Sequence, residues 1–282
     1  MRLTALIMMF AAIVGCRAAE TGASVVTSFL PIYCWAANVA GDKAQVDNLL
    51  PARADAHDYS FTPSDARRLN AARLVVVNGM EMEEWLGAWR RSASTADQKL
   101  VTISDAVPKD QLIEGNPHFW LDPQLACVAV SNIAASLKRI DPANAATYHS
   151  NALTYVMRLQ KLDADVRDGL AGITNRALVT YHDAFPYFAR RYNLDIVGVV
   201  EKVAGVNPTP RNLAALSRTI RERNVRAIFV PPNSASRLAR RIADDLRVPV
   251  ADLDTIEAGK LTPDAYEEAM RANLKSLQKV LK

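Results

Sequence analysis

Short apolar runs alternate with longer amphipathic stretches along most of the chain. The runs Val25–Phe29, Leu74–Val77 and Leu100–Ile103 are rich in aliphatic and β-branched residues, which is typical of buried strands in a parallel sheet, and Asn48–Leu50 closes a fourth strand-like piece. Between and after them, Pro63–Ala72 and Pro123–Ile140 carry apolar residues at helical spacing. Strands that alternate with helices predict an α/β fold with helices on both faces of its sheets.

One long stretch, Pro142–Leu170, interrupts the alternation. Its apolar residues keep helical spacing, and no glycine occurs before Gly169, so a helix roughly 40 Å long is expected. Four further strands are predicted beyond it: Ala177–Tyr181, Ile196–Val200, Ala227–Val230 and Val248–Leu253. The pattern therefore predicts two lobes, each with a parallel four-stranded sheet flanked by helices: an N-terminal lobe (20–141), a linking helix (142–171) and a C-terminal lobe (172–282).

The first 19 residues have the pattern of an export signal. Arg2 supplies the positive start, and Leu6–Val14 is apolar but too short to span a bilayer. The following Ile-Val-Gly-Cys is similar to a bacterial lipobox, in which Cys16 would be acylated; ordinary cleavage near Ala18 is the alternative. We therefore expect a periplasmic or extracytoplasmic protein, tethered to the membrane if Cys16 is lipidated.

Composition excludes several classes of protein. Half of the 282 residues are hydrophobic and the net charge is +4, so the chain is neither disordered nor strongly basic. No basic stripe with interleaved aromatic residues is present, and we expect no nucleic-acid partner. Three cysteines are too few for a disulfide scaffold. Cys34 and Cys127 would remain after export, either as a disulfide or as two free thiols.

Three of the four histidines follow strand-like runs, where an open α/β sheet binds ligands: His57, His118 and His182. Asp254 has the same kind of position after the last strand, whereas His149 lies within the long helix. Three imidazoles and a carboxylate suit Zn²⁺, with Mn²⁺ or Fe²⁺ as alternatives. Spacing alone does not separate metal ligands from hydrogen-bonded structural histidines.

Each histidine is followed closely by an aspartate. Asp58 and Asp183 come one residue after His57 and His182, and Asp122 comes four residues after His118. A histidine that binds a metal usually donates its other ring N–H to a carboxylate or a carbonyl. These aspartates are candidates for that role, and helix N-capping is the alternative for Asp122 and Asp183.

Several longer motifs surround the candidate ligands and continue through the second half of the chain: Leu-Pro at 50–51, His-Asp-Tyr-Ser-Phe-Thr-Pro-Ser-Asp at 57–65, Leu74–Leu86, Pro-His-Phe-Trp-Leu-Asp-Pro at 117–123, Tyr-His-Asp-Ala-Phe at 181–185, and Pro210–Leu216 with Val225–Val230. These motifs resemble those of the zinc- and manganese-specific solute-binding proteins of bacterial ABC importers, the high-affinity zinc uptake type, whose two lobes are joined by a rigid helix. Together they extend over nearly all of the chain that follows the signal.

The resemblance implies a monomer that binds one metal ion and delivers it to a membrane permease and its ATPase. It implies His57, His118 and His182 as ligands, with Asp254 at the position of the acidic one. Histidine at position 182 favours zinc, because family members with glutamate at the matching position resemble proteins that bind manganese or iron. The loop 105–116 contains no histidine, unlike the loop of many zinc members, so manganese stays an open alternative.

Two other kinds of function could use a site of three histidines: hydrolysis, and metal delivery or adhesion without transport. A zinc hydrolase needs an open coordination position, but the sequence has no His-Glu-x-x-His motif and no glutamate beside the three histidines, so we expect no enzyme. A periplasmic metal chaperone or an adhesin would share the fold and the site, and the sequence does not distinguish them from a transport protein. No P-loop is present, so another subunit would have to hydrolyse ATP.

Overall fold

The computed structural model describes residues 23–93, 96–202, 208–232 and 237–282. The expected signal segment, including Cys16, lies outside these residues. Among the described residues, no helix combines the length and the apolar character that crossing a membrane requires.

The N-terminal lobe contains a parallel sheet with the strand order β2-β1-β3-β4. Its strands are β1 (Ala23–Thr27), β2 (Ala44–Asn48), β3 (Leu74–Val77) and β4 (Leu100–Thr102). Its main helices are α1 (Leu30–Ala40), α2 (Pro63–Ala71) and α5 (Pro123–Ile140), and two short helices, α3 (Gly87–Ser92) and α4 (Ala96–Lys99), lie between β3 and β4. Every residue of β3 is buried, as its apolar run predicts for a parallel strand.

The C-terminal lobe repeats this topology, with the order β6-β5-β7-β8 in a second parallel sheet. Its strands are β5 (Ala177–His182), β6 (Asp195–Glu201), β7 (Ile228–Val230) and β8 (Val250–Asp252). Its helices are α7 (Pro186–Tyr192), α8 (Pro210–Glu222) and α9 (Arg237–Leu246). The predicted class, two four-stranded parallel α/β lobes, is confirmed. Because all the strands in a sheet are parallel, their carboxyl ends meet at one edge of each sheet.

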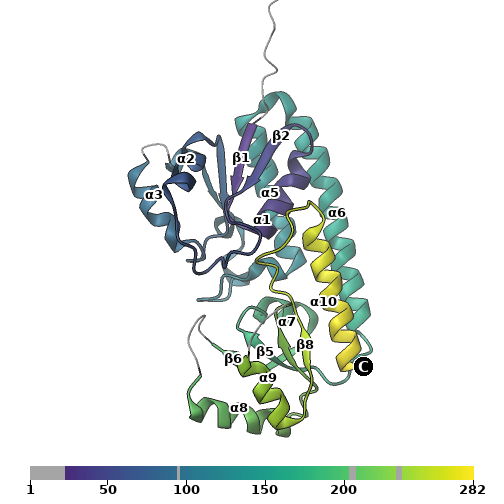
Figure 1. Ribbon diagram of the computed structural model, residues 1–282. Helices are drawn as coiled ribbons and strands as arrows, with labels where there is room; N and C mark the ends of the chain where they lie inside the picture. The colour runs from purple at the N-terminus through teal and green to yellow at the C-terminus, as the bar shows by residue number, and fades with distance from the viewer. Residues whose placement is uncertain (1–22, 94–95, 203–207, 233–236) are drawn as a thin grey trace, which may run out of the picture.

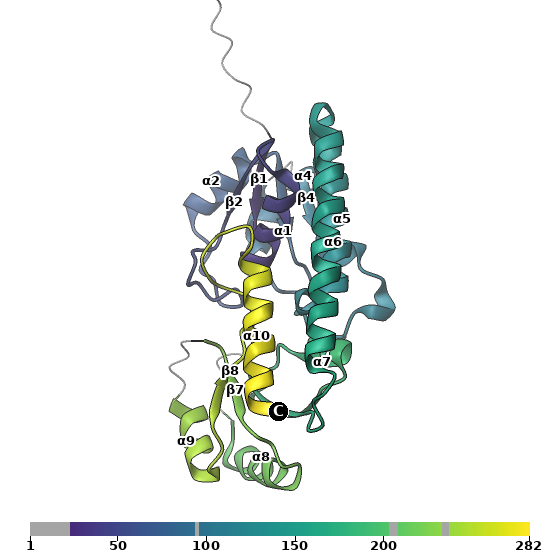
Figure 2. The same cartoon turned by 90° about the vertical axis from the view of Figure 1, so that its right-hand side faces the viewer.

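The expected long helix is α6 (Ala145–Leu170), preceded by one 3-10 turn at Pro142–Asn144. It extends from the N-terminal lobe down to the C-terminal lobe (Figure 1). The closing helix α10 (Ala265–Leu281) packs alongside α6; its first turn lies against α1 of the N-terminal lobe, and it ends beside the C-terminal lobe (Figure 2). A single apolar core extends from the first sheet through these helices to one face of the second sheet.

The two cysteines do not form a disulfide. Cys34 is buried in α1 and its thiol donates a hydrogen bond to the carbonyl of Thr262 at 3.3 Å. Cys127, in α5, is half-buried and its thiol faces the carbonyl of Val156 at 4.0 Å. The alternative of a Cys34–Cys127 disulfide is therefore wrong, because the two thiols face different parts of the structure.

Candidate metal centre

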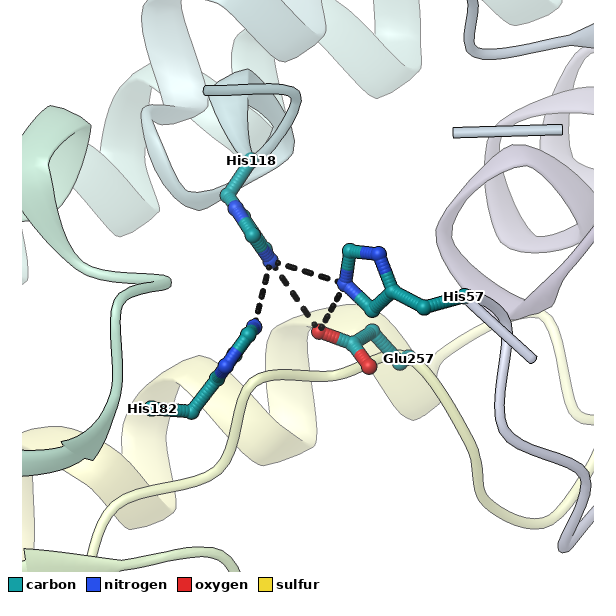
Figure 3. A group of neighbouring side chains, drawn as sticks. All are labelled: His57, His118, His182 and Glu257. Atoms are coloured by element: carbon teal, nitrogen blue, oxygen red, sulfur yellow. Dashed lines mark hydrogen bonds and ion pairs between the residues drawn. The ribbon is translucent and has the colours of Figure 1, made fainter. Parts of the chain in front are cut away.

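Four side chains from separate loops converge between the lobes (Figure 3). His57 lies in the loop that follows β2, and His118 directly precedes the 3-10 turn Phe119–Leu121. His182 ends β5, and Glu257 lies in the loop between β8 and α10. One ligand atom from each lies within 4.8 Å of all the others. Each lobe thus contributes two side chains.

The distances from His118 to the other two imidazoles match those between ligands of a tetrahedral zinc ion. The Nε2 atom of His118 lies 3.2 Å from that of His57 and 3.1 Å from that of His182. Bonds of about 2.0–2.1 Å to a tetrahedral Zn²⁺ would separate two ligand nitrogens by about 3.3 Å. The Glu257 Oε1 atom lies 3.4 Å from His118 Nε2 and 3.8 Å from His57 Nε2. This oxygen is buried without a hydrogen-bond partner, which a bound cation would supply.

The environment favours neutral imidazoles at two positions. Burial, together with the neighbouring imidazoles, lowers the pKa of His118 and His182, and the attraction of Glu257 only partly opposes it. Burial would also lower the pKa of His57, but the nearby Glu257 carboxylate outweighs burial and raises it. Burial opposes ionisation of Glu257, yet His118 and His57 hold its pKa well below the usual range. The environment therefore favours two neutral imidazoles beside a carboxylate anion, and the third, His57, must give up any bound proton before it can bind a divalent cation.

The acidic member of this group is Glu257, and the expected ligand Asp254 is not part of it. The Asp254 Oδ1 atom instead accepts a hydrogen bond from the Ile256 N–H at 2.8 Å. Asp254 was expected because it is the first acidic residue of the loop after the strand. The side chain that reaches the imidazoles belongs to Glu257, three residues further along this loop. The sequence contained one indication of Glu257 as the alternative, since it is the next acidic residue in the same loop.

An asparagine, rather than an aspartate, orients His118. The Oδ1 atom of Asn116 lies 3.0 Å from His118 Nδ1 and also accepts the His118 backbone N–H at 3.1 Å. A carbonyl oxygen is only an acceptor, so Nδ1 carries the proton and the Nε2 lone pair faces the centre. Asn116 was not predicted; its position two residues before His118 in Asn-Pro-His was the available signal.

The three aspartates proposed for that role lie elsewhere. Asp122 caps α5 by accepting the Gln124 N–H at 2.9 Å, which is the capping alternative. Asp58 is exposed, and it is Asp55 whose carboxylate accepts the backbone N–H groups of His57 and Asp58, at 2.8 and 3.4 Å. Asp183 contacts the site through its backbone carbonyl, which accepts the Asn116 amide at 2.8 Å. None of the three carboxylates has a hydrogen bond to a site imidazole among the described contacts.

The comparison with known proteins agrees with this geometry. The family model for zinc-uptake complex component A, periplasmic (ZnuA), matches residues 25–280. The chain is 30% identical over 277 residues to the high-affinity zinc uptake system protein ZnuA of Bacillus subtilis, covering 90% of this chain and 86% of that protein. It is also 30% identical over 275 residues to the manganese-binding lipoprotein MntA of Halalkalibacterium halodurans, covering 92% and 91%.

A solved structure shows the same architecture. The solute-binding protein FpvC of Pseudomonas aeruginosa, in complex with Ni²⁺, superposes with a TM-score of 0.83 at 28% identity, covering 93% of this chain and 97% of that one. The family match includes both sheets, the long helix and all four side chains of the centre. The chain therefore belongs to the family of periplasmic zinc-uptake component A proteins.

Proposed function

We propose that this protein captures one Zn²⁺ ion between its lobes and delivers it to a membrane permease that a separate ATPase drives. In this proposal the ligands are His57, His118, His182 and Glu257. The observation that carries it is the convergence of three imidazole nitrogens and one buried carboxylate oxygen within 4.8 Å of one another. Membership of the periplasmic zinc-uptake family supports both the cargo and the transport role.

The same geometry argues against hydrolysis. A catalytic zinc keeps one coordination position open for water or substrate, whereas Glu257 supplies a fourth protein atom here. With four protein ligands the ion is held as cargo. Release then requires that the two halves of the ligand set separate, because each lobe provides two of the four atoms.

Manganese is the second candidate cargo, and the relative named as a manganese-binding lipoprotein favours it. Mn²⁺ prefers carboxylate, carbonyl and water oxygens, while imidazole suits zinc. The centre offers three nitrogens and one carboxylate, so the donor set supports zinc more strongly.

Metal competition tests the proposal. The protein without its signal segment is stripped of metal and titrated with Zn²⁺ in the presence of excess Mn²⁺, together with the variants His182→Ala and Glu257→Ala. His149→Ala is the matched control, because His149 is an exposed histidine on α6, away from the centre. We expect one tightly bound Zn²⁺ per chain, weaker binding in both site variants and unchanged binding in the control.

Two results would contradict the proposal. Preferential retention of Mn²⁺ would assign the protein to manganese transport. Full zinc affinity in Glu257→Ala would remove Glu257 from the ligand set and leave an open coordination position.

A further inference from the structure

The loop that carries Glu257 contains a buried residue in a disfavoured backbone conformation. Ile256, directly before Glu257, has a φ of 62° and no exposed surface. A β-branched residue rarely adopts positive φ and keeps it only where the surroundings hold it there. The strain thus lies in the residue whose backbone determines where Glu257 points.

Asp254 provides one of these constraints. Its Oδ1 atom accepts the Ile256 N–H at 2.8 Å, which closes a turn of the kind that aspartate and asparagine side chains form two residues before a left-handed residue. The carboxylate of Asp254 is therefore engaged with the backbone of its own loop, and it is not within the group of converging ligand atoms.

Two neighbouring contacts fix the rest of the turn. Asn273 of α10, which is buried, bonds both backbone groups of Asp254: its Oδ1 accepts the N–H at 2.6 Å and its Nδ2 donates to the carbonyl at 2.8 Å. The indole N–H of Trp120 donates to the Thr255 carbonyl at 2.7 Å, and the Trp120 ring packs 4.8 Å from that of His118. Residues 254, 255 and 256 are thus each held before the chain reaches Glu257.

We propose that Asp254 is a positioning residue for metal binding, which holds Ile256 in the left-handed conformation and so directs the Glu257 carboxylate at the imidazoles. The inference rests on the proposed function, because it takes Glu257 as a ligand. If Ile256 relaxed to an ordinary φ near −60°, the chain would rotate by about 120° at this residue. That rotation would carry the Glu257 side chain away from His118 and His57.

A double-mutant cycle tests this role. Asp254→Ala removes the acceptor, and we expect zinc affinity to fall about 10- to 100-fold, as for other residues that orient metal ligands. In a Glu257→Ala background the same change is expected to alter affinity by less than about twofold, because Asp254 then has no ligand to position. Asp254→Asn keeps a carbonyl acceptor and is expected to remain within a few-fold of the unmodified protein. The matched control is Asp252→Ala, which removes an exposed carboxylate two residues earlier.

A spectroscopic readout separates positioning from a general structural effect. Co²⁺ in place of zinc reports its ligand set through its visible spectrum, and the spectrum of Asp254→Ala should resemble that of Glu257→Ala. If Asp254→Ala does not fold, Asp254→Asn decides alone: retained affinity supports positioning, and a loss of tenfold or more overturns it.

Other results would also overturn the inference. If Asp254→Ala lowers zinc affinity equally in the unmodified protein and in the Glu257→Ala variant, Asp254 acts on the metal or the fold directly. If Asp254→Ala leaves the zinc affinity of the otherwise unmodified protein unchanged, while Glu257→Ala weakens binding, a positioning role is excluded. If Glu257→Ala itself has no effect, the proposed ligand set fails instead, which is a distinguishable outcome.

Discussion

At the residue scale, one amide group joins the two lobes at the metal centre. The Asn116 carbonyl accepts the ring N–H of His118 from the N-terminal lobe, and its NH₂ donates to the carbonyl of Asp183, next to His182 in the C-terminal lobe. The same side chain therefore selects the His118 tautomer and links the loops that carry His118 and His182.

Replacement of this amide should weaken metal binding without removing a ligand. We expect Asn116→Ala to lower zinc affinity about 10- to 100-fold, because the His118 ring loses the acceptor that fixes its tautomer. Competition with a chromophoric chelator measures the change. Asn212→Ala, an exposed asparagine on α8, is the control and should bind like the unmodified protein. Equal affinities in the two variants would show that Asn116 does not orient the ligand.

Zinc affinity should also depend on pH, chiefly through His57. A raised pKa means that His57 accepts a proton at higher pH than a free histidine, and that proton must leave before zinc binds. We therefore expect affinity to fall as the pH is lowered from 7.5 through 6. His118 and His182, with lowered pKa values, compete with protons only at lower pH. Titrations at a series of pH values measure the slope, and a flat profile across this range would contradict the expectation.

At the scale of elements, a buried aspartate connects three helices. Asp163 of α6 is 2% exposed and accepts hydrogen bonds from Arg191 of α7, from Arg167 one turn along α6, and from Gln124 of α5. Burial opposes its ionisation, but the bond and charge of Arg191 outweigh burial and lower its pKa. The linking helix is thus joined to an adjacent helix of each lobe by a charged group.

Loss of this carboxylate should destabilise the fold. Asp163→Ala removes the nearer carboxylate from Arg191 and leaves it Asp122, at 3.9 Å, so we expect the free energy of unfolding to fall by about 2–3 kcal/mol. Urea denaturation of the metal-free protein measures this. Asp165→Ala, two residues along the same helix, removes a more exposed carboxylate that pairs with Lys161 and Arg271, and should cost less than about 1 kcal/mol. Similar costs for the two variants would mean that the buried network contributes little.

Acid should remove the same stabilisation. Because the pKa of Asp163 is lower in the folded protein than in the unfolded chain, its contribution is present above the unfolded value of about 3.9. It is lost as the pH falls through the folded value. The stability difference between the unmodified protein and Asp163→Ala should therefore be largest near neutral pH and shrink in acid.

At the scale of the whole molecule, metal binding should stabilise both lobes together. Each lobe provides two ligand atoms, and α10 packs along the long helix with its first turn against α1 of the N-terminal lobe. A ligand that binds only the folded state stabilises it by about 2.7 kcal/mol at a free concentration 100 times its Kd.

Thermal or urea unfolding with and without zinc measures this effect. We expect one cooperative transition shifted upward by zinc, and the shift should be lost in His118→Ala and in His182→Ala alike, although these ligands belong to different lobes. The His149→Ala control should retain it. A shift that survives the loss of either ligand would show that zinc stabilises one lobe independently of the other.

Much of the fold could be predicted from sequence because its signals are local. Apolar spacing and flanking prolines predict a helix at Pro123–Ile140, and the helix in the structure has these bounds. The long helix is predicted to begin at Pro142 and begins three residues later, at Ala145. Parallel strands then bring their carboxyl ends to one edge, so the three histidines after strand-like runs were expected to meet, and they do.

The remaining features depend on contacts between distant residues. Asp254 and Glu257 lie in one loop, and no periodic pattern indicates which carboxylate faces the metal. That choice is set by the left-handed Ile256 and by Asn273, 19 residues beyond Asp254 on another helix. The free thiols Cys34 and Cys127 likewise follow from how α1 and α5 pack. The elements, the two lobes and the three imidazoles can thus be predicted from local patterns. The acidic side chain of the centre and its supports depend on tertiary contacts, because distant partners set the direction of the backbone in a loop.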